Sequence, residues 1–152
     1  MYDKLIFDYI KQMLGGKVRL MVTGSARISP DILKFLKICF CCDILEGYGM
    51  TESFAGSCCS MPGDPETGTI GGPMKNCKVR LREEPNFGFS LEKNKGELCI
   101  SGCSIMKSYF KEPEKSAEAL KDGWLATGDI AEILPNGSIK LIGRLKNLIK
   151  LS

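Results

Sequence analysis

The chain has 152 residues, of which 43% are hydrophobic, enough apolar material for one modest globular core. The formal net charge of +3, with no basic block, gives no indication of nucleic-acid binding. The longest apolar runs are far shorter than the ~20 residues of a membrane-spanning helix, and the charged segment 2–13 is not typical of a signal peptide.

The N-terminal part of the chain alternates helix and strand patterns. Apolar side chains at helical spacing over 2–13 predict a helix that Gly15 and Gly16 end. The apolar run Val18–Val22 predicts a short buried strand. This strand leads into a loop of small residues, TGSARIS, at 23–29.

A second helix is predicted to begin at Ser29, which suits the N-cap, with Pro30 at the first helical position. Its buried stripe is expected to consist of four apolar residues: Ile32, Phe35, Leu36 and Cys39. Asp43–Leu45 then predicts a second strand. The order helix, strand, helix, strand indicates a parallel α/β layer within residues 1–56.

The composition changes after residue 56. The segment Ser57–Gly72 is rich in Gly, Pro, Ser and Asp and predicts a loop. Four strand patterns and one short helix follow: strands Cys77–Leu81, Glu97–Ser101, Ile130–Leu134 and Ser138–Ile142, and helix Glu114–Lys121. The last two strands flank a Pro-Asn-Gly turn, which is typical of a hairpin. We therefore expect a mostly antiparallel β subdomain, distorted and barrel-like, over 57–143.

Eight cysteines are many for this length. Several of them sit in apolar surroundings: Cys39, Cys41 and Cys42 beside Phe40, and Cys99 between Leu98 and Ile100. This favours reduced, buried thiols in an intracellular protein. The alternative is a metal site with four cysteine ligands: Cys39, Cys42, Cys99 and Cys103. The unequal spacing of the two pairs and the absence of histidine argue against this alternative.

Two motifs in the first part carry candidate chemistry. TGSA at 23–26 lies between a strand and a helix, where small residues would let the backbone approach a flat ligand, although most such loops only turn the chain. GYGMTE at 47–52 offers an aromatic ring for stacking, the hydroxyl of Thr51 for phosphate oxygens and the carboxylate of Glu52 for Mg²⁺. Taken alone, GYGMTE is better explained as a buried tyrosine followed by a capping pair. No Walker phosphate loop occurs in the sequence.

Two motifs in the second part complement them. ATGD at 126–129 is predicted to place Asp129 after a glycine turn, where its carboxylate could accept hydrogen bonds from both ribose hydroxyls; a turn-forming aspartate is the common alternative. GRLKNLIK at 143–150 has three cations on a strand-to-loop pattern. Arg144 could clamp a ribose or phosphate, and a solvated basic face is the alternative.

In their order along the chain, these motifs resemble the adenylate-forming enzyme superfamily. GELCISG with SIMKSYF at 96–110 and DGWLATGDI at 122–130 strengthen the resemblance, which covers nearly the whole chain. Within the superfamily, PGDPETGTIGGPM, SYFKEPEKSAEALKDGW and LPNGSIKLIGRLKNLIKLS are most similar to the long-chain fatty acyl-CoA synthetases. The resemblance implies part of their N-terminal domain, ending in a hinge segment over 144–152. It also implies ATP, AMP, Mg²⁺ and CoA as cofactors and cosubstrates, with a fatty acid as the substrate.

The resemblance implies a role for each matching residue. The nucleotide would be bound by Gly24, Ser25, Ala26, Gly47, Tyr48, Gly49, Met50, Thr51, Asp129 and Arg144. Within this set, the TGSA residues would border the adenine, Tyr48 would stack on it, and Asp129 and Arg144 would bind the ribose. Residues 47–50, with Phe54, would also border the acyl chain.

The catalytic residues that the resemblance implies are Thr51, Glu52 and Lys150. Thr51 would touch the α-phosphate and Glu52 would hold Mg²⁺, whereas Lys150 would act in the second half-reaction. Lys146 would be the hinge about which a C-terminal domain rotates. Ala126 stands where many relatives have a histidine, which removes a side chain near the nucleotide.

We further expect the superfamily's phosphate loop and its C-terminal catalytic lysine to lie outside this chain, so that the chain alone is inactive. Two alternatives stay open: a ligase for a medium-chain or aryl acid, and a non-catalytic nucleotide-binding domain. The resemblance suggests an intracellular, cytoplasmic enzyme with peripheral membrane association. Acyl chain-length preference and oligomeric state do not follow from the sequence.

Overall fold

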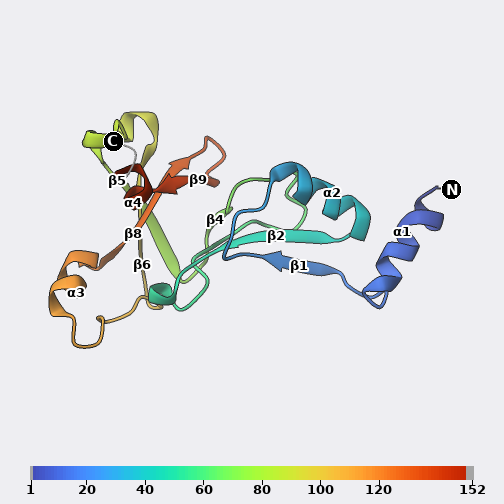
Figure 1. Ribbon diagram of the computed structural model, residues 1–152, viewed down its shortest axis with the longest axis horizontal. Helices are drawn as coiled ribbons and strands as arrows, with labels where there is room; N and C mark the ends of the chain where they lie inside the picture. The colour runs from blue at the N-terminus through green and yellow to red at the C-terminus, as the bar shows by residue number, and fades with distance from the viewer. Residues whose placement is uncertain (1, 150–152) are drawn as a thin grey trace.

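The computed structural model describes residues 2–149, and its N-terminal half is an α/β layer (Figure 1). Its elements are α1 (Tyr2–Met13), β1 (Leu20–Thr23), α2 (Pro30–Phe40) and β2 (Asp43–Tyr48). Strands β1 and β2 pair in parallel, with Thr23 opposite Glu46. The predicted order and the parallel layer are therefore confirmed.

Two burial predictions for this layer are wrong. Strand β1 is an edge strand of its sheet, and Val22 is 66% exposed rather than buried. In α2, the buried residues are Leu33 and Cys39, whereas Ile32 and Phe35 of the predicted stripe are mostly exposed. The helix sequence PDILKFLKICF is apolar around most of its circumference, so the spacing of its apolar residues could not determine which face packs on β2.

The segment predicted as a loop after residue 56 contains two short strands. They are β3 (Cys58–Cys59) and β4 (Gly72–Pro73), which extend the first sheet in the order β1-β2-β3-β4. Both new pairings are antiparallel, and Tyr48 at the end of β2 lies opposite Cys58. Each strand has only two residues, too few for an alternating pattern to reveal it.

The second half of the chain forms an antiparallel five-stranded sheet, as predicted. Its strands are β5 (Cys77–Arg82), β6 (Lys95–Gly102), β7 (Leu120–Lys121), β8 (Trp124–Ile133) and β9 (Ile139–Arg144). The shorter helical elements are η1 (Thr51–Ser53), η2 (Pro85–Phe87), η3 (Leu91–Lys93), α3 (Pro113–Ala119) and α4 (Leu145–Ile149). The hairpin of β8 and β9 is where the Pro-Asn-Gly turn predicted it. None of the helices in the described part of the chain is both long and apolar enough to cross a membrane.

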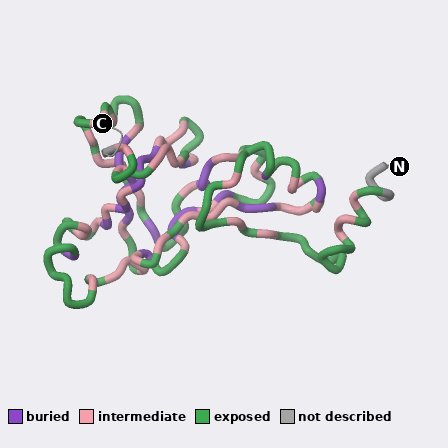
Figure 2. Tube along the Cα trace, in the orientation of Figure 1, coloured by how far each residue is buried: buried purple, intermediate pink, exposed green. Residues whose placement is uncertain are grey.

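The hydrophobic core lies mainly in the second sheet and where it meets the first (Figure 2). It comprises Cys58, Ile70, Cys77, Leu98, Ile100, Ala131 and Ile139. A short backbone ladder joins the two sheets at this point. The N–H of Ile70 donates to the carbonyl of Ile139 at 2.8 Å, and the N–H of Ile139 donates to the carbonyl of Gly71 at 2.9 Å. The two halves are therefore held together by backbone hydrogen bonds as well as by side-chain packing.

All eight cysteines are free thiols, and four of them are buried: Cys39, Cys58, Cys77 and Cys99. For Cys39 and Cys99, the predicted burial is confirmed. Cys41 and Cys103 are exposed, so the predicted burial is wrong for Cys41.

We expect Cys58 to resist alkylation at neutral pH, while Cys41 and Cys103 react. Burial raises the pKa of Cys58 from its usual 9.0 to about 12, and the neighbouring Cys77 adds to the rise. Because the folded-state pKa is the higher one, the stabilisation from a neutral thiol is present below about pH 9 and is lost as pH rises towards 12. Mass spectrometry after iodoacetamide treatment checks this order. Equal labelling of Cys58 and Cys103 would contradict the burial of Cys58.

Candidate functional site

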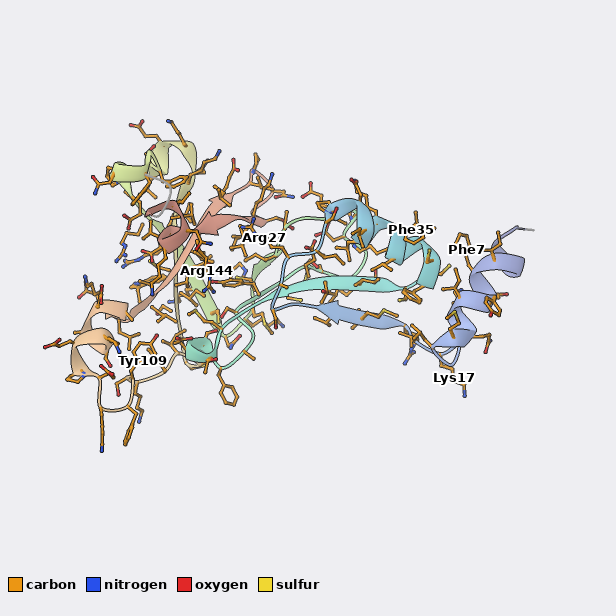
Figure 3. The ribbon with its side chains drawn as sticks, viewed as in Figure 1. Phe7, Lys17, Arg27, Phe35, Tyr109 and Arg144 are labelled. Atoms are coloured by element: carbon orange, nitrogen blue, oxygen red, sulfur yellow. The ribbon has the colours of Figure 1, made fainter. Side chains whose placement is uncertain are left out.

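A cleft of about 530 Å³ lies where the two sheets meet, within the size range of small-molecule sites. Nine residues predicted for the nucleotide site line it: Gly24, Ser25, Ala26, Gly47, Tyr48, Gly49, Met50, Asp129 and Arg144. In Figure 3, Arg27 in the loop after β1 and Arg144 at the end of β9 mark its two sides. The fold thus brings together residues that lie up to 120 positions apart, from Gly24 to Arg144.

The α/β side of the cleft is built from the carboxyl ends of two parallel strands, the usual ligand position in an open α/β sheet. The TGSA loop follows β1, and the GYG segment ends β2. The two segments approach closely, because a Cβ added at Gly24 would lie 3.2 Å from the carbonyl oxygen of Gly47. Small residues at this edge therefore leave room for a ligand beside the backbone.

Asp129 is the centre of the polar contacts in the cleft. It is only 7% exposed, and its Oδ2 accepts a hydrogen bond of 2.7 Å from the Tyr48 hydroxyl. Its Oδ1 accepts one of 3.0 Å from Nε of Arg144. Burial raises the pKa of Tyr48 well above its usual value, and the adjacent carboxylate adds to the rise, so the phenol donates at neutral pH. Each carboxylate oxygen has a second lone pair for a ligand hydroxyl.

The prediction that Asp129 follows a turn after an apolar segment is wrong. The ATGD motif lies inside β8, where the ladder with β6 is interrupted by a bulge. Glu97 pairs with Ile130 and Cys99 pairs with Ala126, so three residues of β8 lie opposite Leu98. Gly128 has a φ of +73°, a conformation that glycine adopts easily. Such bulges redirect side chains, and here the bulge includes the cleft aspartate itself.

Thr51 and Glu52 do not line the cleft. They lie in η1, one turn beyond the GYG segment, where Glu52 joins the segment that precedes α3. Oε1 of Glu52 accepts a hydrogen bond of 2.7 Å from the Tyr109 hydroxyl, and its backbone carbonyl accepts one of 2.8 Å from Met106. The hydrogen bond to Glu52, together with burial, raises the pKa of Tyr109 to about 12. Figure 3 shows Tyr109 between α3 and η1.

Replacing Tyr109 with Phe is expected to loosen the segment before α3 and to lower the free energy of unfolding by about 1 kcal/mol, because one hydrogen bond to a carboxylate is lost. Urea denaturation and hydrogen–deuterium exchange of peptides covering 103–112 measure both effects. Tyr9→Phe is the matched control, since the Tyr9 side chain is 71% exposed on α1. Equal unfolding midpoints for the two variants would contradict a stabilising role for the contact between Tyr109 and Glu52.

The remaining predicted residues lie beyond β9. Lys146 is exposed in α4 and does not line the cleft, and Lys150 lies outside the described residues. The described part of the GRLKNLIK segment, 143–149, continues from strand into helix rather than loop. Sequence reasoning missed five polar residues of the cleft wall: Arg27, Glu46, Thr69, Lys140 and Asn147. Glu46 immediately precedes GYGMTE, and its Oε1 accepts a hydrogen bond of 2.7 Å from the N–H of Gly68; its position beside the motif was the available signal.

Within residues 2–149, no three His, Cys, Asp or Glu side chains converge on a point that could hold a metal ion. The cysteines considered as ligands lie on separate elements: Cys39 is in α2, on the right of Figure 1, and Cys99 is in β6, on the left. A magnesium ion needs only one or two carboxylates when phosphate oxygens supply its other ligands. Glu52, whose Oε1 accepts a hydrogen bond from the Tyr109 hydroxyl, has a carboxylate of the type that could ligate such an ion.

The model of the AMP-binding enzyme family matches residues 2–110. Long-chain-fatty-acid–CoA ligase 1 from Homo sapiens is 45% identical over 153 residues, covering 100% of this chain and 22% of the relative. Fatty acyl-CoA synthetase A from Dictyostelium discoideum is 43% identical over 155 residues, covering 99% and 23%. The chain therefore spans about a fifth of the length of the curated relatives it matches.

Solved structures share the fold. A benzoate CoA ligase from Burkholderia xenovorans LB400 superposes with a TM-score of 0.77 at 29% identity, covering 85% of this chain and 26% of its own. A Mycobacterium tuberculosis fatty acyl CoA synthetase gives 0.73 at 28% identity, covering 86% and 26%. The α/β layer and the curled antiparallel sheet are thus an arrangement found in ligases that differ in their acid substrate.

Proposed function

Because this chain belongs to the AMP-binding enzyme family, we propose that it is the part of a long-chain fatty acid–CoA ligase that binds the adenosine of ATP. The observation that carries the proposal is the buried Asp129, held by Tyr48 and Arg144 in a nucleotide-sized cleft. The family match and the names of the most similar relatives support the reaction class. The mixed α/β fold expected from the resemblance is confirmed.

The proposed reaction has two steps. In the first, a fatty-acid carboxylate oxygen forms a bond to the α-phosphorus of ATP, and the bond to pyrophosphate breaks. In the second, the sulfur of CoA bonds to the acyl carbon, and AMP leaves. Residues of this chain would position the nucleotide for both steps, and positioning of this kind lowers a barrier by removing the entropy cost of alignment.

The cleft divides these positioning roles between its two walls. The TGSA loop and the ring of Tyr48 would border the adenine on the α/β side. On the other side, Asp129 would accept hydrogen bonds from the ribose hydroxyls. Arg144 keeps this carboxylate oriented through a contact of 3.0 Å and is itself a candidate ribose ligand. A buried acceptor with fixed geometry favours a hydroxylated sugar over an apolar ligand.

Magnesium is proposed to bind at Glu52, with Thr51 towards the α-phosphate. Glu52 supplies one hard oxygen donor, and its hydrogen bond to Tyr109 fixes the direction of the carboxylate. The ion would neutralise charge that builds up on the phosphates. CoA is the proposed acyl acceptor, Lys146 the proposed hinge residue and Lys150 a residue of the second step. The division of the chain into an α/β part (1–56), a mainly β part (57–143) and a hinge segment (144–152) stays a prediction.

The substrate class is tested by pyrophosphate exchange. With the natural protein, ATP–pyrophosphate exchange is expected with palmitate and not with octanoate or benzoate. Exchange stimulated by benzoate instead would favour the aryl-acid alternative, which the fold similarity to a benzoate CoA ligase keeps open. Binding of AMP without exchange for any acid would favour a non-catalytic nucleotide-binding domain.

We also propose that the ligase works in the cytoplasm and associates peripherally with membranes. Its proposed substrate and product are amphiphiles that partition into bilayers, which is the physical reason for this expectation. Fractionation of cells followed by a salt wash tests the proposal. Recovery of the protein only in the soluble fraction would contradict membrane association.

A further inference from the structure

We propose that Glu97 is a positioning residue for the nucleotide site, which it serves by fixing the β8 bulge that presents Asp129. The inference rests on the proposed function, in which Asp129 binds ribose. Glu97 is on β6 and does not line the cleft. It acts from the strand next to β8, through the backbone N–H of Gly128.

The first observation is a buried carboxylate bonded to the bulge. Glu97 is 2% exposed, and its Oε1 accepts a hydrogen bond of 2.9 Å from the N–H of Gly128. Its Oε2 forms an ion pair with Nη2 of Arg82, without the geometry of a hydrogen bond. Arg82 lies directly opposite Glu97 in the β5–β6 ladder. The Glu97 carboxylate is thus held by Arg82 through one oxygen and accepts the N–H of Gly128 through the other.

The second observation is the shape of the bulge itself. Because three residues of β8 lie opposite Leu98 of β6, the regular ladder cannot satisfy all their backbone groups. Side chains replace it: the Thr127 hydroxyl donates to the Leu98 carbonyl at 2.7 Å and accepts from the N–H of Asp129 at 3.1 Å. Glu97 satisfies the remaining N–H between them, that of Gly128.

The position of Asp129 therefore depends on this acceptor. Without Glu97, the Gly128 N–H would lose its hydrogen-bond acceptor, and the bulge could relax by turning that peptide. Such a rotation would change the position of Asp129 relative to Tyr48 and Arg144. Burying a charged side chain costs desolvation energy. A buried glutamate at this position is therefore best explained by a local backbone geometry that an apolar side chain could not specify.

Glu97→Met and Glu97→Gln form a matched pair that tests this role in the natural protein. Both remove the charge that faces Arg82 and keep the side-chain length, but only Gln retains an acceptor for Gly128. We expect the dissociation constant for AMP to rise about tenfold for Glu97→Met and less than about threefold for Glu97→Gln, because one hydrogen bond to the bulge is lost in the first variant alone. Hydrogen–deuterium exchange of the peptide that contains Gly128 should accelerate only in Glu97→Met.

Ile100→Ala controls for a purely structural effect. Ile100 is fully buried on the same strand and belongs to the hydrophobic core, so its truncation destabilises the sheet without touching the bulge. AMP affinity, measured well below each unfolding midpoint, should stay near that of the wild type in this control. A similar loss of affinity in Ile100→Ala and Glu97→Met would overturn the positioning role.

Two further outcomes are decisive. If Glu97→Met does not fold, Glu97→Gln still decides, because a tenfold loss of AMP affinity in a folded Gln variant would show that the charge, not the acceptor to Gly128, is what matters. If the wild type itself does not bind AMP, the proposed function fails, and with it the link from Glu97 to nucleotide binding. The exchange measurement would then still support or overturn the control of the bulge by Glu97.

Discussion

Replacing Asp129 with Ala is expected to weaken AMP binding by about a hundredfold or more. The proposed pair of hydrogen bonds from the ribose hydroxyls to the carboxylate is lost, at about 1.5–3 kcal/mol each, and 1.4 kcal/mol corresponds to a factor of ten. The Tyr48 hydroxyl and Arg144 also lose the acceptor that holds them at 2.7 and 3.0 Å. Isothermal titration calorimetry with AMP, on the natural protein, measures the change.

Glu132→Ala is the matched control for this variant. Glu132 is an acidic residue on the same strand, paired with Lys95 at 3.6 Å on a partly exposed surface, and it does not line the cleft. We expect its AMP affinity to be unchanged. Asp129→Asn should fall between Ala and the wild type, because one acceptor oxygen is kept. Unchanged affinity in a folded Asp129→Ala protein would overturn the assignment of Asp129 to the ribose.

Replacing Gly49 with Ala is expected to lower the free energy of unfolding by at least about 3 kcal/mol. A Cβ at this position would lie 1.2 Å from the carbonyl oxygen of Ala55 and 2.4 Å from its carbonyl carbon. These are backbone atoms of a tight turn, in which the N–H groups of Ser53 and Ala55 both donate to the Met50 carbonyl. The turn cannot shift without breaking these bonds. Urea denaturation gives the change in stability.

The same substitution should also disturb the residues that the turn presents. Thr51 and Glu52 lie between Gly49 and Ala55, so a displaced turn would separate Glu52 from Tyr109. Gly72→Ala is the control, because no heavy atom lies within 4 Å of a Cβ added there and its φ is not in the left-handed region. If the two alanine variants unfold at the same denaturant concentration, the close approach of Ala55 to Gly49 is wrong.

The sequence predicted the sequential order of the elements, because most of them carry strong local signals. The second helix begins at Pro30, and the hairpin of β8 and β9 turns at a Pro-Asn-Gly sequence. Both features are set by neighbouring residues and need no tertiary information. The orientation of α2 is different. Its sequence is apolar on several sides, and only packing against β2 selects Leu33 over Phe35 for burial.

The candidate site also has features that the sequence predicted and features that only the tertiary structure shows. The residues of TGSA and GYG were predicted from the ordered family resemblance, and the structure places both motifs at the ends of neighbouring parallel strands. The hydrogen bond between Glu52 and Tyr109 joins residues 57 positions apart, so no local sequence pattern reveals it. The bulge was missed because ATGD reads locally as a turn. Only the opposite strand, with Glu97 and Leu98 facing the insertion, shows that the chain continues as a strand.

The backbone ladder between Ile70–Gly71 and Ile139 has a mechanical consequence for the cleft. Ile70 lines the cleft, and Ile139 begins the strand that ends in Arg144, so the two backbone hydrogen bonds between the segment Ile70–Gly71 and Ile139 hold the two sides of the cleft at a fixed separation. Moving the two sides apart would break both hydrogen bonds inside a core where Ile139 is fully buried. The two walls should therefore behave as a single stiff clamp. A ligand that arrives or leaves would do so through the open side of the cleft, without a change in the separation of its walls.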